Sequence, residues 1–271
     1  DKTLVIVISQ SGETLDTMAA LREAKARGGH ILSIVNVVGS SIARESDDVL
    51  YTWAGPEIAV ATTKAYSTQL ILLDMLGLYF ADALGTVGQS EYAATIDEIL
   101  RLPGKMEQML ENIDDIKHFA SKYFNHNSVF FIGRNLDYAM GLEGSLKLKE
   151  ISYIHSEAYA SGELKHGTIS LIEDGTLVIA LGTYAPLFDK AMSNVVEVQA
   201  RGADVLALTT EGHVTEMKKT VENVMSVPET HKILQPSLGV VPLQLFAYYV
   251  ALLRGCDIDK PRNLAKSVTV E

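Results

Sequence analysis

The chain has 271 residues, of which 47% are hydrophobic, and a formal net charge of −11 at pH 7. This length and apolar content predict one large or two ordinary globular domains, and the acidic balance argues against nucleic acid as a partner. A single cysteine, Cys256, excludes an internal disulfide framework and a thiolate metal cluster and is typical of the cytoplasm, while no apolar run predicts a membrane partner.

The first predicted element is a strand over residues 4–9. Five of its six residues are apolar and four are β-branched, which favours a parallel strand that is covered on both faces. The strand leads directly into a polar loop, Ser9–Thr14 (SQSGET). An amphipathic helical pattern follows from Leu15 to about Arg27.

The loop Ser9–Thr14 predicts an anion site. Hydroxyl and amide side chains gather at a helix N-terminus, where free N–H groups and the helix dipole favour negative charge. The loop has no lysine and no GxxxxGK[ST] pattern, so it is not a nucleotide P-loop. The alternative is that Ser11 and Thr14 only cap the helix, but capping needs one such residue and the loop has more. We expect a single phosphate on a small molecule.

Several elements recur at an offset of 173 to 175 residues, which predicts two copies of one α/β unit. The recurring elements are Thr3–Ile6 and Thr176–Ile179, Ala26–Gly28 and Ala200–Gly202, the strands 30–35 and 204–208, the strands 48–53 and 223–227, and the apolar helices that open at Gln69 and Gln244.

A strand over 128–134 and a helix over 137–151 precede the second copy and have no counterpart before the first. We therefore expect the first domain to lack its opening strand and helix. Residues 90–123 have helical spacing and predict connecting helices with a break at Pro103 and Gly104. The expected division is a first domain at 1–88, connecting helices at 89–125, a second domain at 126–255 and a tail at 256–271.

The densest polar stretch follows the helix over 137–151. Lys147 and Glu150 are three residues apart and share a helix face, which is either an ordinary surface ion pair or part of a site. The next segment is long for a connection between a helix and a strand and is rich in titratable residues: His155, Glu157, Glu163, Lys165 and His166. A metal site is the rival interpretation, but the HxE spacing is weak and no second cysteine helps, so we expect no metal.

Two further clusters could bind a ligand. Residues 54–64 lie between a strand and a helix, and their simpler interpretation is a loop that ends in a Thr-capped helix start. The C-terminal tail, 259–271, has three cations and apolar residues at Leu264, Val268 and Val270. Chain termini are often poorly ordered, yet these apolar residues could pack the tail over a site and hold the amine of Lys266 there, buried near other cations.

Six segments together resemble the sugar isomerase half of the glucosamine-6-phosphate synthases, the glutamine–fructose-6-phosphate aminotransferases. They are SQSGET at 9–14, GSS at 39–41, TTKAY at 62–66, KLKEISYIH at 147–155, GELKHG at 162–167 and PRNLAKSVTVE at 261–271. The first segment alone marks only the wider phosphosugar-binding SIS family, whereas the last three are more specific. The resemblance covers nearly the whole chain.

The resemblance implies two SIS domains, each a flavodoxin-like three-layer αβα sandwich around a parallel sheet, the first truncated at its N-terminus. It also implies a homodimer that needs no cofactor and converts fructose 6-phosphate and ammonia to glucosamine 6-phosphate. The ammonia comes from a glutaminase domain of the longer chain, and nothing in this sequence resembles that domain. No nucleic acid or membrane partner is implied.

The resemblance also implies roles for ten residues. Phosphate contacts fall on Ser9, Gln10, Ser11 and Thr14, sugar contacts on Val60 and Thr62, and catalytic positions on Lys147, Glu150, His166 and Lys266. The family often has serine where this chain has Thr62. A histidine suits ring opening near neutral pH, and the family assigns it to His166 reaching in from the partner subunit. Glu150 would move the proton between C1 and C2, Lys147 would pair with it, and Lys266 would form a Schiff base with the C2 carbonyl.

Two other functions compete with an amino-transferring isomerase. One is a sugar-phosphate-binding SIS module without chemistry, and the other is a simple phosphosugar isomerase that uses no ammonia. A binding module would keep the loop Ser9–Thr14 but would need none of Glu150, His166 and Lys266. The simple isomerase has no evident need for the tail PRNLAKSVTVE.

Overall fold

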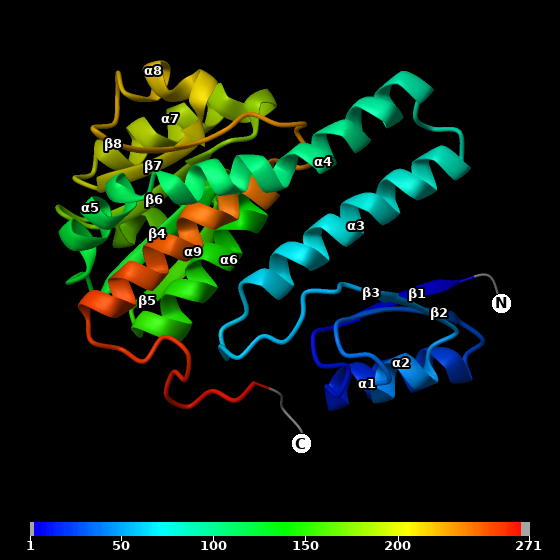
Figure 1. Ribbon diagram of the computed structural model, residues 1–271. Coiled ribbons are helices and arrows are strands. Elements are labelled where there is room, and N and C mark those ends of the chain that lie inside the picture. The colour runs from blue at the N-terminus through cyan, green and yellow to red at the C-terminus, as the bar shows by residue number, and fades with distance from the viewer. Residues whose placement is uncertain (1–2, 267–271) are drawn as a thin grey trace. The chain divides into compact units, whose positions relative to one another are not determined.

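The computed structural model describes residues 3–266 and divides into two compact units (Figure 1). Unit 1 comprises Asp1–Leu76 and the C-terminal stretch Arg262–Glu271, and unit 2 comprises Gly77–Pro261. The boundary falls within the long helix α3 (Lys64–Ala83). The two units are described in turn.

Unit 1 is built on a three-stranded parallel sheet in the order β1-β2-β3. The strands β1 (Leu4–Ser9) and β2 (His30–Val35) have the predicted bounds, and β3 (Asp48–Tyr51) ends two residues earlier than expected. The helices α1 (Leu15–Ala26) and α2 (Ser41–Glu45) follow β1 and β2. The predicted strand–loop–helix unit at the start of the chain is therefore confirmed.

One face of this sheet packs on α1 and α2 through a buried apolar cluster. Its members are Val7, Met18, Leu21, Ile31, Val35, Ile42 and Ala43. Side chains alternate along a strand, so Leu4, Ile6 and Ile8 point to the opposite face, where they are 44%, 38% and 40% exposed. Among the described strands, β1 pairs only with β2.

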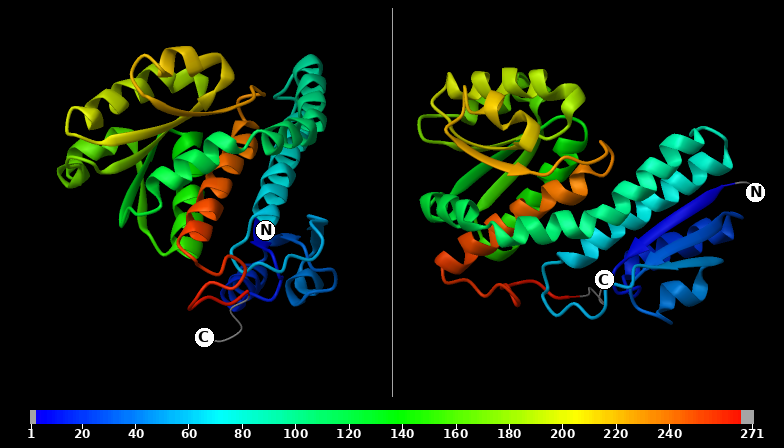
Figure 2. Two further views of the ribbon diagram at one scale, coloured as in Figure 1. Left: turned by 60° about the vertical axis from the view of Figure 1, so that its left-hand side comes forward. Right: turned by 45° about the horizontal axis from the view of Figure 1, so that its top comes forward.

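Unit 2 contains a five-stranded sheet in the order β5-β4-β6-β7-β8, and every pairing is parallel. Figure 2 shows the ribbon from two further sides. The strands are β4 (Ser128–Gly133), β5 (His155–Ala160), β6 (Leu177–Gly182), β7 (Asp204–Thr210) and β8 (Asn223–Val227). The neighbours β6-β7-β8 follow the same order along the chain as β1-β2-β3 of unit 1. The strand order reverses between β4 and β6, which is where ligands bind in open parallel sheets.

Helices cover both faces of this sheet, as expected for a three-layer αβα sandwich (Figure 1). The helices α5 (Asp114–Tyr123), α6 (Leu136–Ser152) and α9 (Gln235–Leu253) lie on one face, and α7 (Phe188–Gln199) and α8 (Val214–Met217) lie on the other. Short 3-10 turns complete the unit: η1 (Ser161–His166), η2 (Thr168–Leu171), η3 (Ala185–Leu187) and η4 (Glu211–His213).

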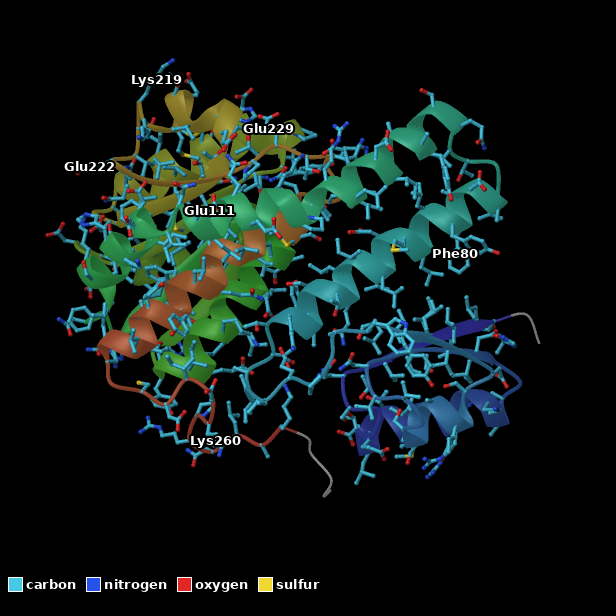
Figure 3. All side chains as sticks on the ribbon, viewed as in Figure 1. Phe80, Glu111, Lys219, Glu222, Glu229 and Lys260 are labelled. Atoms are coloured by element: carbon cyan, nitrogen blue, oxygen red, sulfur yellow. The ribbon has the colours of Figure 1, made fainter. Side chains whose placement is uncertain are left out.

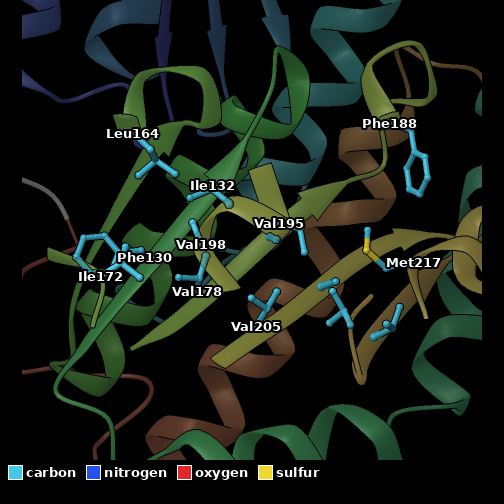
Figure 4. Packing of buried hydrophobic residues seen from close by; sticks show 14 residues of the cluster. Phe130, Ile132, Leu164, Ile172, Val178, Phe188, Val195, Val198, Val205 and Met217 are labelled. Atoms are coloured by element: carbon cyan, nitrogen blue, oxygen red, sulfur yellow. The ribbon is translucent and has the colours of Figure 1, made fainter. Parts of the chain in front are cut away.

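The core between the sheet and α7 is almost wholly aliphatic and aromatic (Figure 4). Alternate residues of β4 and β6 supply one wall, and α7 and η1 supply the other. The members include Phe130, Ile132, Leu164, Val178, Ala180, Val195, Val198, Val205 and Met217. Four charged side chains of unit 2 that lie at the surface are those of Glu111, Lys219, Glu222 and Glu229 (Figure 3).

The predicted helix break at Pro103 and Gly104 is wrong. Helix α4 (Gln89–Glu111) runs through the proline, and the break comes at Asn112, before α5. A proline removes one backbone hydrogen bond, but contacts on both sides of it hold this helix. Leu102 is 2% exposed, and the amine of Lys105 reaches back across the proline to Glu98 at 2.6 Å.

The polar segment after α6 was expected to connect a helix to a strand, but part of it is itself a strand. Residues His155–Ala160 form the edge strand β5, which pairs with β4 in parallel register. An edge strand needs only one hydrogen-bonded neighbour and tolerates polar side chains. The hydrophobic pattern of a buried strand was therefore absent from this segment.

Helix α9 is long and apolar enough to cross a membrane by length and composition, which the sequence reading did not anticipate. More than half of its most apolar window is buried inside the protein. It packs against α6 and α5. A helix that is hydrophobic all round is expected at such a central position in a globular domain.

Candidate functional site

Hydroxyl groups converge at the start of α1, in the loop Ser9–Thr14. Ser9 is buried, with 6% of its surface exposed. Its Oγ lies 2.9 Å from the Thr14 Oγ1 and accepts a hydrogen bond from the Gly12 N–H at 3.1 Å. The Glu13 N–H donates to the Ser11 Oγ at 3.2 Å. Thr14 occupies the N-cap position, yet its side chain makes no capping hydrogen bond. The capping interpretation therefore does not explain the Thr14 hydroxyl.

The segment Gly39–Ser41 packs against this loop and donates a hydrogen bond to it. Gly12 has a φ of 66°, and a Cβ there would overlap the Ser40 side chain, so the position requires glycine. The Ser41 N–H donates to the Glu13 carboxylate at 2.8 Å, and this bond holds the pKa of Glu13 below its usual value. The Gln10 Oε1 and the Ser40 Oγ are buried without a hydrogen-bond partner in the described part of the chain, so both can serve a bound ligand.

The loop before α3 receives the tail lysine. The Lys266 Nζ lies 3.0 Å from the Glu57 Oε2 and donates to the Ala59 carbonyl at 2.6 Å. The Thr63 N–H donates to the other Glu57 oxygen at 2.9 Å. Burial raises the pKa of Glu57, but the bonds from Thr63 and Lys266 outweigh burial and hold it below the usual value. This arrangement places Lys266 beside the loop that carries Val60 and Thr62.

The prediction that Lys266 is buried near other cations is wrong in two respects. The amine contacts a carboxylate and a carbonyl rather than other cations, and its side chain is 31% exposed rather than buried. Leu264, which was expected to pack the tail down, is 45% exposed. The expected packing of Val268 and Val270 lies outside the described residues. Sequence reasoning missed Glu57, although it is the only acidic residue in the cluster 54–64.

Helix α6 carries a buried charge cluster. The Lys147 Nζ lies 2.6 Å from the Glu150 Oε2 and 3.5 Å from the Glu143 Oε1. Lys147 is only 3% exposed, so the alternative of an ordinary surface pair is wrong. Burial raises the pKa of Glu143 to about 7, against the opposing effect of Lys147. Sequence reasoning missed Glu143, although it lies four residues before Lys147 and therefore on the same helix face.

His166 ends the turn η1 and is exposed. The turn is anchored by Leu164, which is 0% exposed, and is followed by Gly167, which has a φ of 153°. His155 and Glu157 form an exposed pair at 3.8 Å. Within residues 3–266, no group of three or more His, Cys, Asp or Glu residues could hold a metal ion.

The candidate residues divide between the two units. Unit 1 carries the loop Ser9–Thr14, the sugar-contact candidates Val60 and Thr62, and Lys266. Unit 2 carries Lys147, Glu150 and His166. The structure brings together the hydroxyls of the loop, Lys147 with Glu150, and Lys266 with the loop before α3.

A parallel sheet with a hydroxyl-rich loop at the carboxyl end of β1 defines a class of α/β proteins in which that loop can hold an anion. The SIS domain family matches this chain over residues 1–79 and 122–254, and the chain belongs to that family. Its relatives include a glutamine–fructose-6-phosphate aminotransferase (isomerizing) of Clostridium tetani, which is 60% identical over 269 residues, or 99% of this chain and 44% of the relative. The chain thus spans less than half the length of that curated relative.

Solved structures agree with this grouping. The C-terminal domain of a glucosamine-fructose-6-phosphate aminotransferase from Francisella tularensis matches 96% of this chain and 74% of that chain, with a TM-score of 0.92 and 37% identity. A glucosamine-6-phosphate deaminase from Thermotoga maritima matches 98% of this chain and 75% of that chain, with a TM-score of 0.74 and 26% identity. The resemblance to the isomerase half of the aminotransferases and the SIS fold are both confirmed.

Proposed function

We propose that this chain is the sugar isomerase part of an enzyme that makes glucosamine 6-phosphate from fructose 6-phosphate and ammonia released from glutamine. The glutaminase domain belongs to the longer protein. The names of the relatives support this proposal. The observation that carries it is the ion pair that Glu150 forms with the buried amine of Lys147. Burying charges is costly, and a module that only bound sugar phosphate would have no use for them.

The loop Ser9–Thr14 binds the phosphate of the sugar in this proposal. Its hydroxyls and N–H groups face one end of α1, where the helix dipole adds to the attraction. The side chains of Gln10, Val60 and Thr62 complete the contacts to the sugar phosphate. The local geometry allows an acidic chain to hold an anion without a positive surface.

The combined substitution Ser11→Ala and Thr14→Ala tests this role. We expect fructose 6-phosphate to bind more weakly by about 1–3 kcal/mol, because two hydrogen bonds to a charged group are lost. Calorimetric titration measures the change. Ser46→Ala is the matched control, since the Ser46 hydroxyl donates to the Ile42 carbonyl in α2. Equal affinity in the double variant and the control would exclude the loop as the phosphate site.

The catalytic steps follow from ordinary acid–base chemistry. His166 transfers the proton that opens the sugar ring, and Glu150 carries a proton between C1 and C2. Lys147 stabilises the charge that develops beside Glu150. Lys266 attacks the C2 carbonyl, water leaves, and the resulting imine makes the C1 protons more acidic. Its neighbour Glu57 holds the amine beside the loop that carries Val60 and Thr62.

Borohydride trapping tests the role of Lys266. Reduction in the presence of fructose 6-phosphate should leave a covalent sugar adduct on Lys266, detected by mass spectrometry of peptides. Lys266→Arg keeps the charge but cannot form the imine, so it should abolish trapping. Lys64→Arg is the control, because Lys64 begins α3 and donates to the Pro56 carbonyl in the loop that Lys266 also contacts. An adduct of undiminished yield in Lys266→Arg would remove this step.

We also propose a homodimer in the cytoplasm, in which His166 serves the site of the partner subunit. An exposed histidine on an anchored turn supports this role, and the single cysteine is typical of a reducing compartment. The two-copy organisation and the domain bounds 1–88, 89–125, 126–255 and 256–271 belong to the same proposal. Sedimentation equilibrium tests the assembly, and a strict monomer at assay concentrations would contradict it.

A further inference from the structure

The loop that follows β6 occupies the same position in unit 2 as the loop Ser9–Thr14 occupies in unit 1. Each loop follows a strand that pairs in parallel with its successor, β1 with β2 and β6 with β7. At an offset of 173 residues, Thr183 corresponds to Gln10 and Tyr184 corresponds to Ser11. Both loops then lead into a helix of 12 residues, α1 or α7. The backbone of unit 2 therefore offers a second place for an anion.

A carboxylate of the chain itself fills this place. Asp137, in the first turn of α6, is 2% exposed. Its two oxygens accept hydrogen bonds from the Thr183 N–H at 3.3 and 3.1 Å, from the Thr183 hydroxyl at 2.5 Å and from the Tyr184 N–H at 3.1 Å. These donors are backbone N–H groups and a hydroxyl, the groups with which loops of this kind hold phosphate.

The charge of Asp137 has no cationic partner among the ion pairs of residues 3–266. Burial raises the pKa of Asp137, and the bonds from Thr183 and Tyr184 act in the opposite direction. The Asp137 carboxylate is thus a buried anion held by N–H and hydroxyl donors without a cation. A phosphate bound to a loop without lysine would be held in the same way. Gly133 lets α6 come this close, since a Cβ there would lie 2.5 Å from the Asp137 backbone.

We propose that the Asp137 carboxylate is a built-in substitute for phosphate that closes the second loop, so that only the loop Ser9–Thr14 is open to a sugar phosphate. The inference rests on the proposed function, since it takes that loop as the substrate site. Asp137 therefore determines which of the two loops can bind a phosphate group. It makes two similar halves of the chain unequal in ligand binding. Removing its side chain should open a second site for inorganic phosphate.

The test uses inorganic phosphate against chloride at equal ionic strength. The background chain carries Ser11→Ala and Thr14→Ala, so that phosphate binding at the first loop is weakened. Adding Asp137→Ala to this background should lower the melting temperature in chloride, and saturating phosphate should raise it again by about 3 °C or more. Calorimetry should then show one phosphate site in addition to any residual binding of the background chain. No phosphate effect in the folded Asp137→Ala chain would overturn the proposal.

Three controls separate the outcomes. Asp204→Ala removes another carboxylate of unit 2, which accepts from the Tyr123 hydroxyl, and should show no phosphate effect. Asp137→Asn keeps the shape and blocks the site, so it should gain no phosphate binding. Adding Thr183→Val to Asp137→Ala removes a donor and should weaken phosphate binding at least tenfold. A phosphate response equal in Asp204→Ala and Asp137→Ala would overturn the proposal.

A refolding assay covers the case in which Asp137→Ala folds poorly. The variant is diluted from urea into phosphate or chloride, and the folded yield is measured by circular dichroism. Phosphate should raise the yield of Asp137→Ala and not that of Asp204→Ala, whereas equal yields in both salts would reject the proposal. A separate measurement tests whether the loop Ser9–Thr14 is the substrate site. If it is not, the parent chain and the chain with Ser11→Ala and Thr14→Ala would bind fructose 6-phosphate with equal affinity.

Discussion

Lys147 shows at the level of a single residue why burial matters to this site. Its amine lies between the carboxylates of Glu143 and Glu150, and its residue is 3% exposed. An exposed pair at the same helical spacing would contribute at most a few tenths of a kcal/mol. A buried pair holds each charge only because the other is present.

Lys147→Met should therefore destabilise the protein by about 3–5 kcal/mol, because two acidic side chains then lose their buried cation. Lys149→Met is the matched control, since Lys149 is exposed on the same helix. We expect the control to lie within about 0.5 kcal/mol of the parent protein. Urea unfolding followed by circular dichroism measures both. Similar losses in the two variants would show that the burial of Lys147 has no energetic consequence.

Glu143 predicts a pH dependence of stability. Its pKa in the folded protein is raised by burial to about 7, from an ordinary value of 4.5. The unfolded chain releases this proton at lower pH, so the contribution of Glu143 to stability is complete below pH 4.5 and is lost as the pH rises through 7. The loss is at most about 3 kcal/mol.

Glu143→Gln should remove this part of the pH dependence. The free energy of unfolding, measured in urea between pH 5 and 8, should fall more steeply for the parent protein than for the variant. Asp74 also has a pKa raised by burial, to about 6, and contributes with the same sign in both proteins. The difference between the two curves therefore isolates Glu143. Parallel curves would mean that Glu143 titrates normally in the folded state.

At the level of elements, glycine sets the distance between α6 and α9. A Cβ on Gly144 would lie 2.8 Å from the Leu243 side chain of α9 and 3.0 Å from the Phe131 ring of β4. Both neighbours are packed in the core, with exposed fractions of 1% each. The helix can carry Lys147 and Glu150 close to the sheet only because this position has no side chain.

Gly144→Ala should destabilise the protein by about 1–3 kcal/mol through overpacking. Gly104→Ala is the control, because Gly104 lies in helix α4 and a Cβ there meets nothing within 4 Å. The control should gain up to about 1 kcal/mol, since alanine is the better helix former. Thermal unfolding distinguishes the two directions. If Gly144→Ala were as stable as the parent protein or more stable, α6 and α9 would be able to move apart without cost.

At the level of the whole molecule, the two units predict a local response to ligand. Fructose 6-phosphate at ten times its dissociation constant should slow amide exchange in residues 9–14 by about tenfold, because exchange there requires release of the ligand. The corresponding loop of unit 2, residues 182–187, should not respond. Hydrogen exchange with mass spectrometry measures both segments in one experiment. Protection confined to unit 2 would place the phosphate site elsewhere.

The sequence alone determined most of the strands and the class of fold. The strands at Leu4–Ser9 and His30–Val35 have strong β-branched apolar patterns, and such patterns can be recognised from consecutive residues. The hydroxyl loop after β1 was also predictable, because it consists of consecutive residues. The strand β5 was not, since an edge position tolerates the polar residues His155 and Glu157.

Only the tertiary structure decided the surroundings of the charged residues. The burial of Lys147, the contact of Lys266 with Glu57 and the contact of Asp137 with Thr183 join residues up to 209 positions apart. The continuity of α4 through Pro103 likewise depends on contacts with packed neighbours. Charges and prolines are tolerated or excluded by the free energy of their final environment, and that environment exists only once the chain has folded.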